Sequence, residues 1–167
     1  SRTVTVAAPP AISRGIVVGE VYDDTTGLPV AGATVQLTGA AAAGLPVEAV
    51  TAVTDARGRY LLRGSAGTAI LRIERDGWTS VARAATLVVG QAVEAFDARL
   101  TPLGAAVEIA PVAGGSAGDA AVAEVVVPAG GVTEAVALRV AGIGQQGLQG
   151  LLPAGWVPVG AIEVRGA

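Results

Sequence analysis

The sequence predicts an all-β protein built as two small β-sandwich domains in tandem. Three observations lead to this prediction. Hydrophobic residues make up 51% of the 167 residues but aromatic residues only 3%, so the apolar content is mostly Ala, Val, Leu and Ile. The apolar residues fall in short runs that alternate with polar ones, which favours strands over helices. The 24 Gly and 9 Pro are spread along the chain, as the turns of a sandwich would be.

The first half of the chain reads as an N-terminal strand and Pro linker, residues 1–11, followed by a domain at residues 12–101. The alternation at Thr3, Val4, Thr5 and Val6, just before Ala-Ala-Pro-Pro, predicts a short edge strand and a stiff linker. Alternating runs within the domain predict strands at residues 15–22, 33–38, 47–54, 59–63, 68–73, near 81, and at 92–100.

The clearest local signal is a hairpin at residues 54–73, TDARGRYLLRGSAGTAILRI. Asp55 can hydrogen-bond the backbone of its own turn, and Gly58 permits a turn with positive φ. Tyr60 is expected to fill the core while its hydroxyl reaches the rim. These roles are structural, so we expect the hairpin to carry no chemistry.

A second domain is predicted at residues 102–167, after a boundary at residues 101–104. Its strands are expected at residues 105–109, 120–127, 133–140 and 157–164, with a flexible turn at 111–119 and an ordered loop at 142–156.

The residue types that are absent narrow the function. The chain has no His, Lys, Cys, Met or Asn, so the usual catalytic triads and dyads and zinc sites cannot be built. Asp23, Asp24 and Asp55 could offer oxygens to calcium, but no loop has calcium-binding spacing, and acidic turns are the better interpretation. We therefore expect no enzymatic activity, no metal and no cofactor.

Charge and hydropathy exclude two classes of partner. The net charge is −3, there is no basic stripe, and five aromatic residues are too few for a stacking platform, so nucleic-acid binding is not expected. No run approaches the roughly 18 apolar residues of a membrane span. The chain starts at Ser1 without a signal peptide, so we expect it to be processed or cut from something longer.

The first predicted domain resembles a known family. GIVVGEVYDDTTGLPVAGATVQL, followed by TDARGRYLLRGSAGT, is similar to the carboxypeptidase regulatory-like domain, a transthyretin-like (pre-albumin) β-sandwich of about seven strands. The resemblance covers roughly residues 12–100. The matching positions are Gly19, Asp24 to Gly27, Pro29, Gly32, Ala33, Val35, Leu37, Thr54, Asp55, Gly58, Tyr60, Gly67 and Thr68. It implies an accessory, non-catalytic fold that is repeated in secreted and cell-surface proteins.

The second domain resembles a different family over about 60 residues. AEVVVPAGGVTEAVALRV is similar to the strand-turn-strand of ZU5-like β-domains of bacterial surface proteins, through Val127, Pro128, Gly130, Val132 and Glu134. LLPAGWVPVGAIEV resembles the continuation of that domain, in which Trp156 is expected to cover the core. The family domain is usually longer, so the resemblance implies that this domain is incomplete by one strand.

Two functional hypotheses follow. In the first, the chain is a structural building block of an extracellular bacterial assembly, such as a surface filament, and associates with itself or with neighbouring domains. Strand donation between copies would then join the spare strand (Thr3, Val4, Thr5, Val6) to the last strand, represented by Ile162 and Val164. The alternative is an accessory module of a larger secreted enzyme or adhesin that binds carbohydrate or protein through the loops at residues 23–28 and 39–46.

Overall fold

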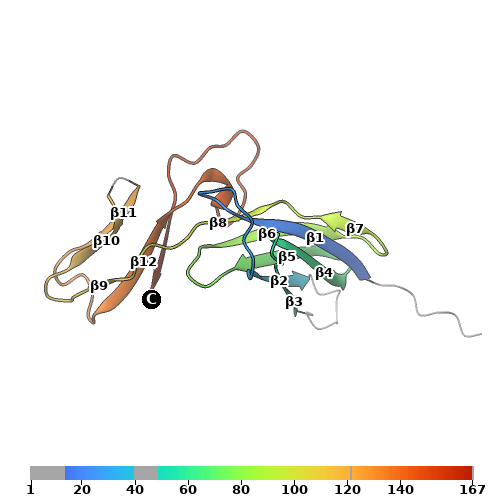
Figure 1. The fold of residues 1–167 in the computed structure, drawn as a ribbon. Coiled ribbons are helices and arrows are strands. Elements are labelled where there is room, and N and C mark those ends of the chain that lie inside the picture. The colour runs from blue at the N-terminus through green and yellow to red at the C-terminus, as the bar shows by residue number, and fades with distance from the viewer. Residues whose placement is uncertain (1–13, 40–48, 121, 167) are drawn as a thin grey trace, which may run out of the picture.

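The protein is elongated, with a β-sandwich at one end and a smaller β unit at the other (Figure 1). The computed structural model describes residues 14–39, 49–120 and 122–166. The strands are β1 (Arg14–Asp23), β2 (Thr34–Gly39), β3 (Ala49–Val53), β4 (Arg59–Ser65), β5 (Gly67–Glu74), β6 (Ser80–Leu87), β7 (Ala92–Glu94), β8 (Ala98–Leu100), β9 (Val107–Ile109), β10 (Gly115–Asp119), β11 (Ala123–Val127), β12 (Val136–Gly142) and β13 (Ile162–Gly166). A single 3₁₀ turn, η1 (Gln145–Gly147), is the one helical element of the described residues. The predicted all-β class is confirmed.

The sandwich consists of two four-stranded sheets. In one sheet β1 lies between β4 on one side and β7 and β8 on the other, and the second sheet has the order β3-β2-β5-β6. Alternate residues of each strand point inward, because successive side chains of a strand face opposite sides of the sheet. The inward aliphatic residues form one continuous core that includes Val17, Val21, Leu37, Leu71 and Ile73.

The hairpin at residues 54–73 has the roles expected from the sequence. Gly58 has a φ of 74°, and the Asp55 carboxylate accepts hydrogen bonds from the backbone of Arg57 and Arg59 at 2.8 and 2.9 Å. Tyr60 lies in the core opposite Gly19, whose missing side chain leaves room for the tyrosine ring. The Tyr60 hydroxyl is buried rather than at the rim, and it has no hydrogen-bond partner among the described residues.

A buried threonine ties the start of this hairpin to the neighbouring loop. The Thr54 hydroxyl donates to the carbonyl oxygen of Val30 at 2.7 Å and accepts from the backbone N–H of Ala33 at 2.9 Å. The hydroxyl therefore provides hydrogen-bond partners for the Val30 carbonyl oxygen and the Ala33 N–H. Leaving such buried groups unpaired would destabilise the folded protein.

The prediction of one strand at residues 92–100 is wrong in detail. The structure has two short strands, β7 and β8, which pair with β1 at different places along its length. Between them the chain bulges, with Ala95 buried and Phe96 exposed. The carbonyl oxygen of Asp97, in this bulge, is turned toward the side chain of Arg83 instead of a neighbouring strand.

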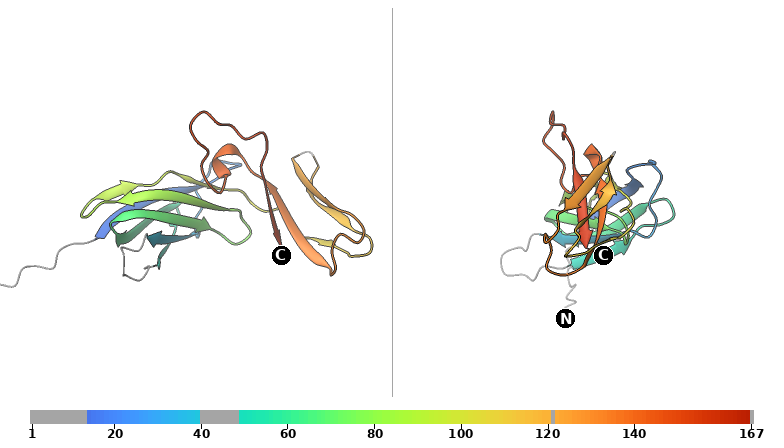
Figure 2. Two further views of the ribbon diagram at one scale, coloured as in Figure 1. Left: turned by 180° about the vertical axis from the view of Figure 1, so that it is seen from behind. Right: turned by 90° about the vertical axis from the view of Figure 1, so that its left-hand side faces the viewer.

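The smaller unit contains a three-stranded sheet, β13-β12-β9, and a hairpin of β10 and β11. The hairpin packs against β12 and β9 as a second layer (Figure 2). The predicted turn at residues 111–119 is therefore partly a strand, because Gly115, Ser116 and Ala117 pair with β11. The predicted strand at residues 157–164 begins only at Ile162.

Candidate interaction site

The sheet β13-β12-β9 has one apolar and one polar face. Antiparallel pairing sets Val140 opposite Val164, and Gly142 opposite Ile162, so these side chains share a face. The whole apolar face consists of Val107, Ile109, Val136, Leu138, Val140, Ile162 and Val164. The opposite face carries Glu108, Ala137, Arg139, Ala141, Glu163 and Arg165.

The hairpin β10–β11 covers only part of the apolar face. It lies over β9 and β12, where Ile109 and Val140 are buried. At β13 the cover ends, so Ile162 remains 50% exposed and Val164 43% exposed. The sequence-based choice of Ile162 and Val164 as interaction residues thus falls on an apolar strip at the edge of a sheet.

Few apolar residues of the smaller unit are buried. The buried ones are Ile109, Ala117, Val140 and Ala141. The exposed large ones are Val112, Val122, Val126, Leu151, Leu152, Trp156, Val157, Val159, Ile162 and Val164. A folded unit with more large apolar side chains outside than inside is typical of an interaction surface.

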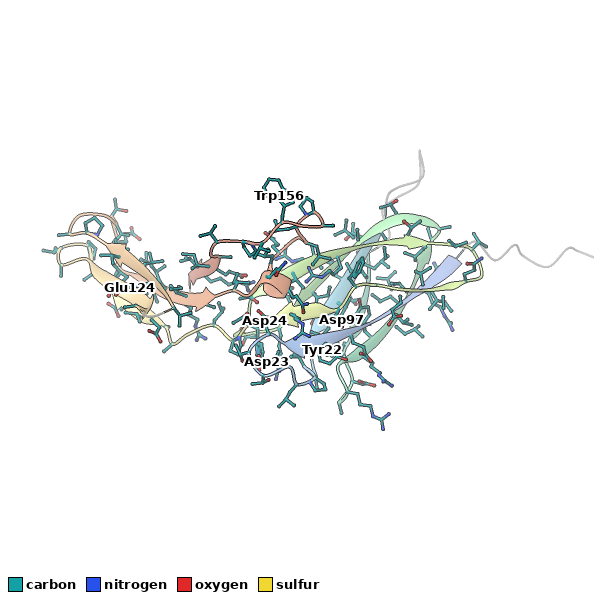
Figure 3. All side chains as sticks on the ribbon, turned by 90° about the horizontal axis from the view of Figure 1, so that it is seen from above. Tyr22, Asp23, Asp24, Asp97, Glu124 and Trp156 are labelled. Carbon is teal, nitrogen blue, oxygen red and sulfur yellow. The ribbon has the colours of Figure 1, made fainter. Side chains whose placement is uncertain are left out.

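Trp156 is not where the sequence suggested. It is 67% exposed, and its side chain lies at the periphery of the molecule, away from the core (Figure 3). The loop that carries it crosses the outside of the sheet, held in part by the Gln145 side-chain amide, which donates to the Trp156 carbonyl oxygen at 3.3 Å. Trp156 therefore adds to the exposed apolar surface.

The other sequence-predicted interaction residues, Thr3, Val4, Thr5 and Val6, lie outside the described residues.

A buried arginine that the sequence analysis did not single out joins the two units. Arg83 of β6 is 2% exposed, and its guanidinium donates to the carbonyl oxygens of Gln146 and Leu148 at 2.8 and 3.3 Å. It also donates to the carbonyl oxygens of Asp97 and Ala82 at 3.1 and 2.8 Å. Burial lowers the pKa of Arg83.

The segment at residues 144–149, which we call the strap, lies against the sandwich at further points. The backbone N–H of Gly144 donates to the Asp24 carboxylate at 3.0 Å, and the N–H of Ala82 donates to the carbonyl oxygen of Gln149 at 2.6 Å. A Cβ at position 144 would crowd the Asp24 carboxylate, so Gly144 lets the backbone approach this side chain closely. β13 itself meets the sandwich at Glu163, whose carboxylate accepts a hydrogen bond from the backbone N–H of Ser80 at 3.4 Å.

Four polar and aromatic side chains on and beside the outer face of β1 contact one another: Glu20, Tyr22, Arg59 and Arg99. The Tyr22 hydroxyl donates to the Glu20 carboxylate, which also receives the Arg59 guanidinium at 2.8 Å. These two hydrogen bonds lower the pKa of Glu20, the one from Tyr22 most, and the same bond raises the pKa of Tyr22. Arg99 stacks on the Tyr22 ring, with 5.7 Å between the guanidinium carbon and the ring centre.

The acidic turn contains no assembled cation site. Asp23 accepts hydrogen bonds from the backbone and hydroxyl of Thr25, while Asp24 accepts from Gly144 in the strap (Figure 3). Across the part of the chain that the structure describes, no three acidic residues gather as metal ligands would. No helix in that part is long and apolar enough to cross a membrane.

These features define an all-β protein with an immunoglobulin-like sandwich. Residues 16–101, just over half of the chain, match the carboxypeptidase regulatory-like domain family. The chain belongs to this family, as its sequence resemblance predicted. Comparison with curated proteins gives no match.

Comparison with solved structures gives similar chains at low sequence identity. The 3-chlorocatechol 1,2-dioxygenase from Rhodococcus opacus 1CP is 16% identical with a TM-score of 0.42, over 54% of this chain and 60% of that one. The shaft pilin SpaA from Lactobacillus rhamnosus GG is 12% identical with a TM-score of 0.41, over 55% and 47%. A streptococcal ancillary pilin is 16% identical with a TM-score of 0.44, over 93% and 59%. The match spans less than two thirds of each of these proteins.

Proposed function

We propose that the chain is a non-catalytic structural protein that builds a bacterial cell-surface assembly, such as a filament, by associating with other copies of itself. The observation that carries this proposal is the apolar face of the smaller unit, which remains half-exposed at Ile162 and Val164. Burying that strip against another chain would supply the stability that a small core lacks. Strand complementation between copies is the mode of association that an open sheet edge favours.

The absence of easily oxidised residues supports an extracellular place for this assembly. The chain has no Cys and no Met, the two side chains that oxidants modify first. The resemblance of residues 102–167 to ZU5-like domains of surface proteins points the same way, and we include that assignment in the proposal. The V-P-x-G turn of the resemblance falls where β11 ends at Val127.

The proposal is tested by light scattering of the full chain over a range of concentrations, with negative-stain microscopy of the same samples. We expect the mass to rise in multiples of 16.3 kDa and regular polymers to form. A constant mass of one chain at every concentration would refute self-association.

One observation favours a second candidate, an accessory module that binds carbohydrate or protein. A shallow hollow of about 460 Å³ lies on the sandwich, lined in part by Glu20, Asp55, Arg59, Tyr60 and Glu94. Carboxylates and a guanidinium in one hollow can hydrogen-bond sugar hydroxyls. A glycan array gives the test, with Glu94→Gln as the variant that should lose any signal. Of the loops expected to bind, residues 40–46 lie outside the described residues.

A further inference from the structure

The proposed self-association requires an acceptor, and we infer that it is the free edge of β13, which takes residues 3–6 of a second copy as an added strand. This inference rests on the proposed function and names the surface and the partner segment. It follows from the shape of the edge, the pattern of the donor and the length of the chain between them.

The edge is open on the side away from β12. In the described residues β13 pairs with β12 alone, so its other side offers unpaired backbone N–H and C=O groups. The charged side chains on its polar face already have partners within the chain, because the Arg165 guanidinium donates to the Glu163 carboxylate at 2.6 Å. Its apolar side chains, Ile162 and Val164, remain half-exposed. A strand that joins here gains backbone hydrogen bonds and apolar contacts together.

The space beside β13 is a groove rather than a flat surface. It has a volume of about 430 Å³ and is lined by both the smaller unit and the sandwich. β13 contributes both its apolar side chains, Ile162 and Val164, and its charged ones, Glu163 and Arg165. The other wall consists of Leu148 and Gln149 of the strap and Arg72 and Ser80 of the sandwich. Since the strap is hydrogen-bonded to the sandwich through Arg83, the walls are fixed before a strand arrives, which lowers the entropic cost of binding.

The donor pattern complements the edge. Val4 and Val6 are two residues apart, as are Ile162 and Val164, so a strand of residues 3–6 sets both valines on the apolar face at once. Thr3 and Thr5 then lie on the same side of the sheet as Glu163 and Arg165, the side on which Glu163 accepts a hydrogen bond from the backbone N–H of Ser80 in the sandwich. Cross-strand pairs of β-branched residues are among the favourable ones in sheets.

The donor is assigned to another copy because a copy's own segment could reach β13 only when almost fully extended. β1 starts at the end of the sandwich remote from β12 and ends beside the strap, where Asp24 meets Gly144 (Figure 1). Its ten residues cover about 30 Å. The ten residue steps from Val4 to Arg14 span at most about 33–36 Å. A copy's own segment would therefore have to run almost fully extended along the whole sandwich to meet β13, whereas a second copy can pair with it head to tail without that constraint.

Paired cysteines test this contact, and the chain offers a clean background because it contains no Cys. In the full chain, Val4→Cys and Val164→Cys are combined in one protein and oxidised mildly. We expect a ladder of disulfide-linked polymers in multiples of 16.3 kDa. Mixing the two single variants should give a dimer that contains one chain of each. The control is Thr5→Cys with Val164→Cys, which should link far less, since residue 5 faces the opposite side.

The outcomes separate the site from the function. Polymers in light scattering without a link between positions 4 and 164 would overturn the site and leave self-association intact. A single-chain mass with no link would overturn both. A ring closed within one chain, or efficient linking of Val164→Cys to itself, would show intrachain closure or two-fold edge pairing, and either result contradicts head-to-tail donation. As a second readout, Val4→Asp with Val6→Asp should abolish polymers while the circular dichroism spectrum stays unchanged.

Discussion

Replacing Arg83 by methionine should loosen the strap and destabilise the protein. Methionine fills much of the same space but cannot donate to the carbonyl oxygens of Asp97, Gln146 and Leu148. Two of the four hydrogen bonds made by Arg83 are short, at 2.8 Å, and a hydrogen bond from a charged group contributes about 1.5–3 kcal/mol. The substitution also removes the cost of keeping a cation buried, which offsets part of the lost hydrogen-bond energy. We therefore expect the free energy of unfolding to fall by about 2–4 kcal/mol.

Urea denaturation followed by circular dichroism measures this loss, and hydrogen exchange of residues 144–149 shows where it arises. The matched control is Arg72→Met on the adjacent strand, where an exposed guanidinium pairs with Glu74 and the change should stay below about 1 kcal/mol. Arg83→Lys should give an intermediate loss, because one ammonium group cannot reach four carbonyl oxygens. Equal stability of Arg83→Met and Arg72→Met, or a lysine variant as stable as the parent, would refute this reasoning.

Three further predictions concern the hairpin at residues 54–73. Gly58→Ala should cost more than Gly27→Ala in urea denaturation: both have positive φ, worth about 1–2 kcal/mol, but only a side chain at 58 collides with the Val21 carbonyl oxygen. Thr54→Val keeps the shape and removes both buried hydrogen bonds, so thermal unfolding should show a loss of about 2–3 kcal/mol; no loss would contradict the role of the hydroxyl. Backbone N–H groups hold the pKa of Asp55 below its ordinary value of 3.8, so its stabilising effect is complete above that value and is lost as the pH falls through the lowered pKa. The urea midpoint of Asp55→Asn should therefore fall less on acidification than that of the parent, and parallel curves would argue against the assignment.

The sequence predicted those parts of the fold that depend on local chemistry. Asp55 and Gly58 define a turn by their own backbone preferences, and the alternation around Val164 identifies which side chains share a face. Both signals are local, so they survive without knowledge of the tertiary structure. The family resemblance, which rests on several such turns, identified the sandwich.

The parts that could not be predicted depend on distant neighbours. Arg83 is buried because carbonyl oxygens from the bulge and the strap converge on it, and no local pattern announces such a group. Strand β10 consists of Gly, Ser, Ala and Asp, which indicate a turn, and it forms because β11 is available for pairing. Trp156 was expected to cover the core because of the resemblance to ZU5-like domains, but it is 67% exposed, since burial depends on which distant segments pack around a residue.

Hydrogen–deuterium exchange of β13 as a function of protein concentration tests the central claim most directly. If another copy adds a strand to this edge, the amides of residues 162–166 should become more protected as concentration rises, while those of β5, inside the sandwich, should not change. Protection of β13 that is the same at every concentration would contradict the account, because it would mean that the edge stays open or is closed within the single chain.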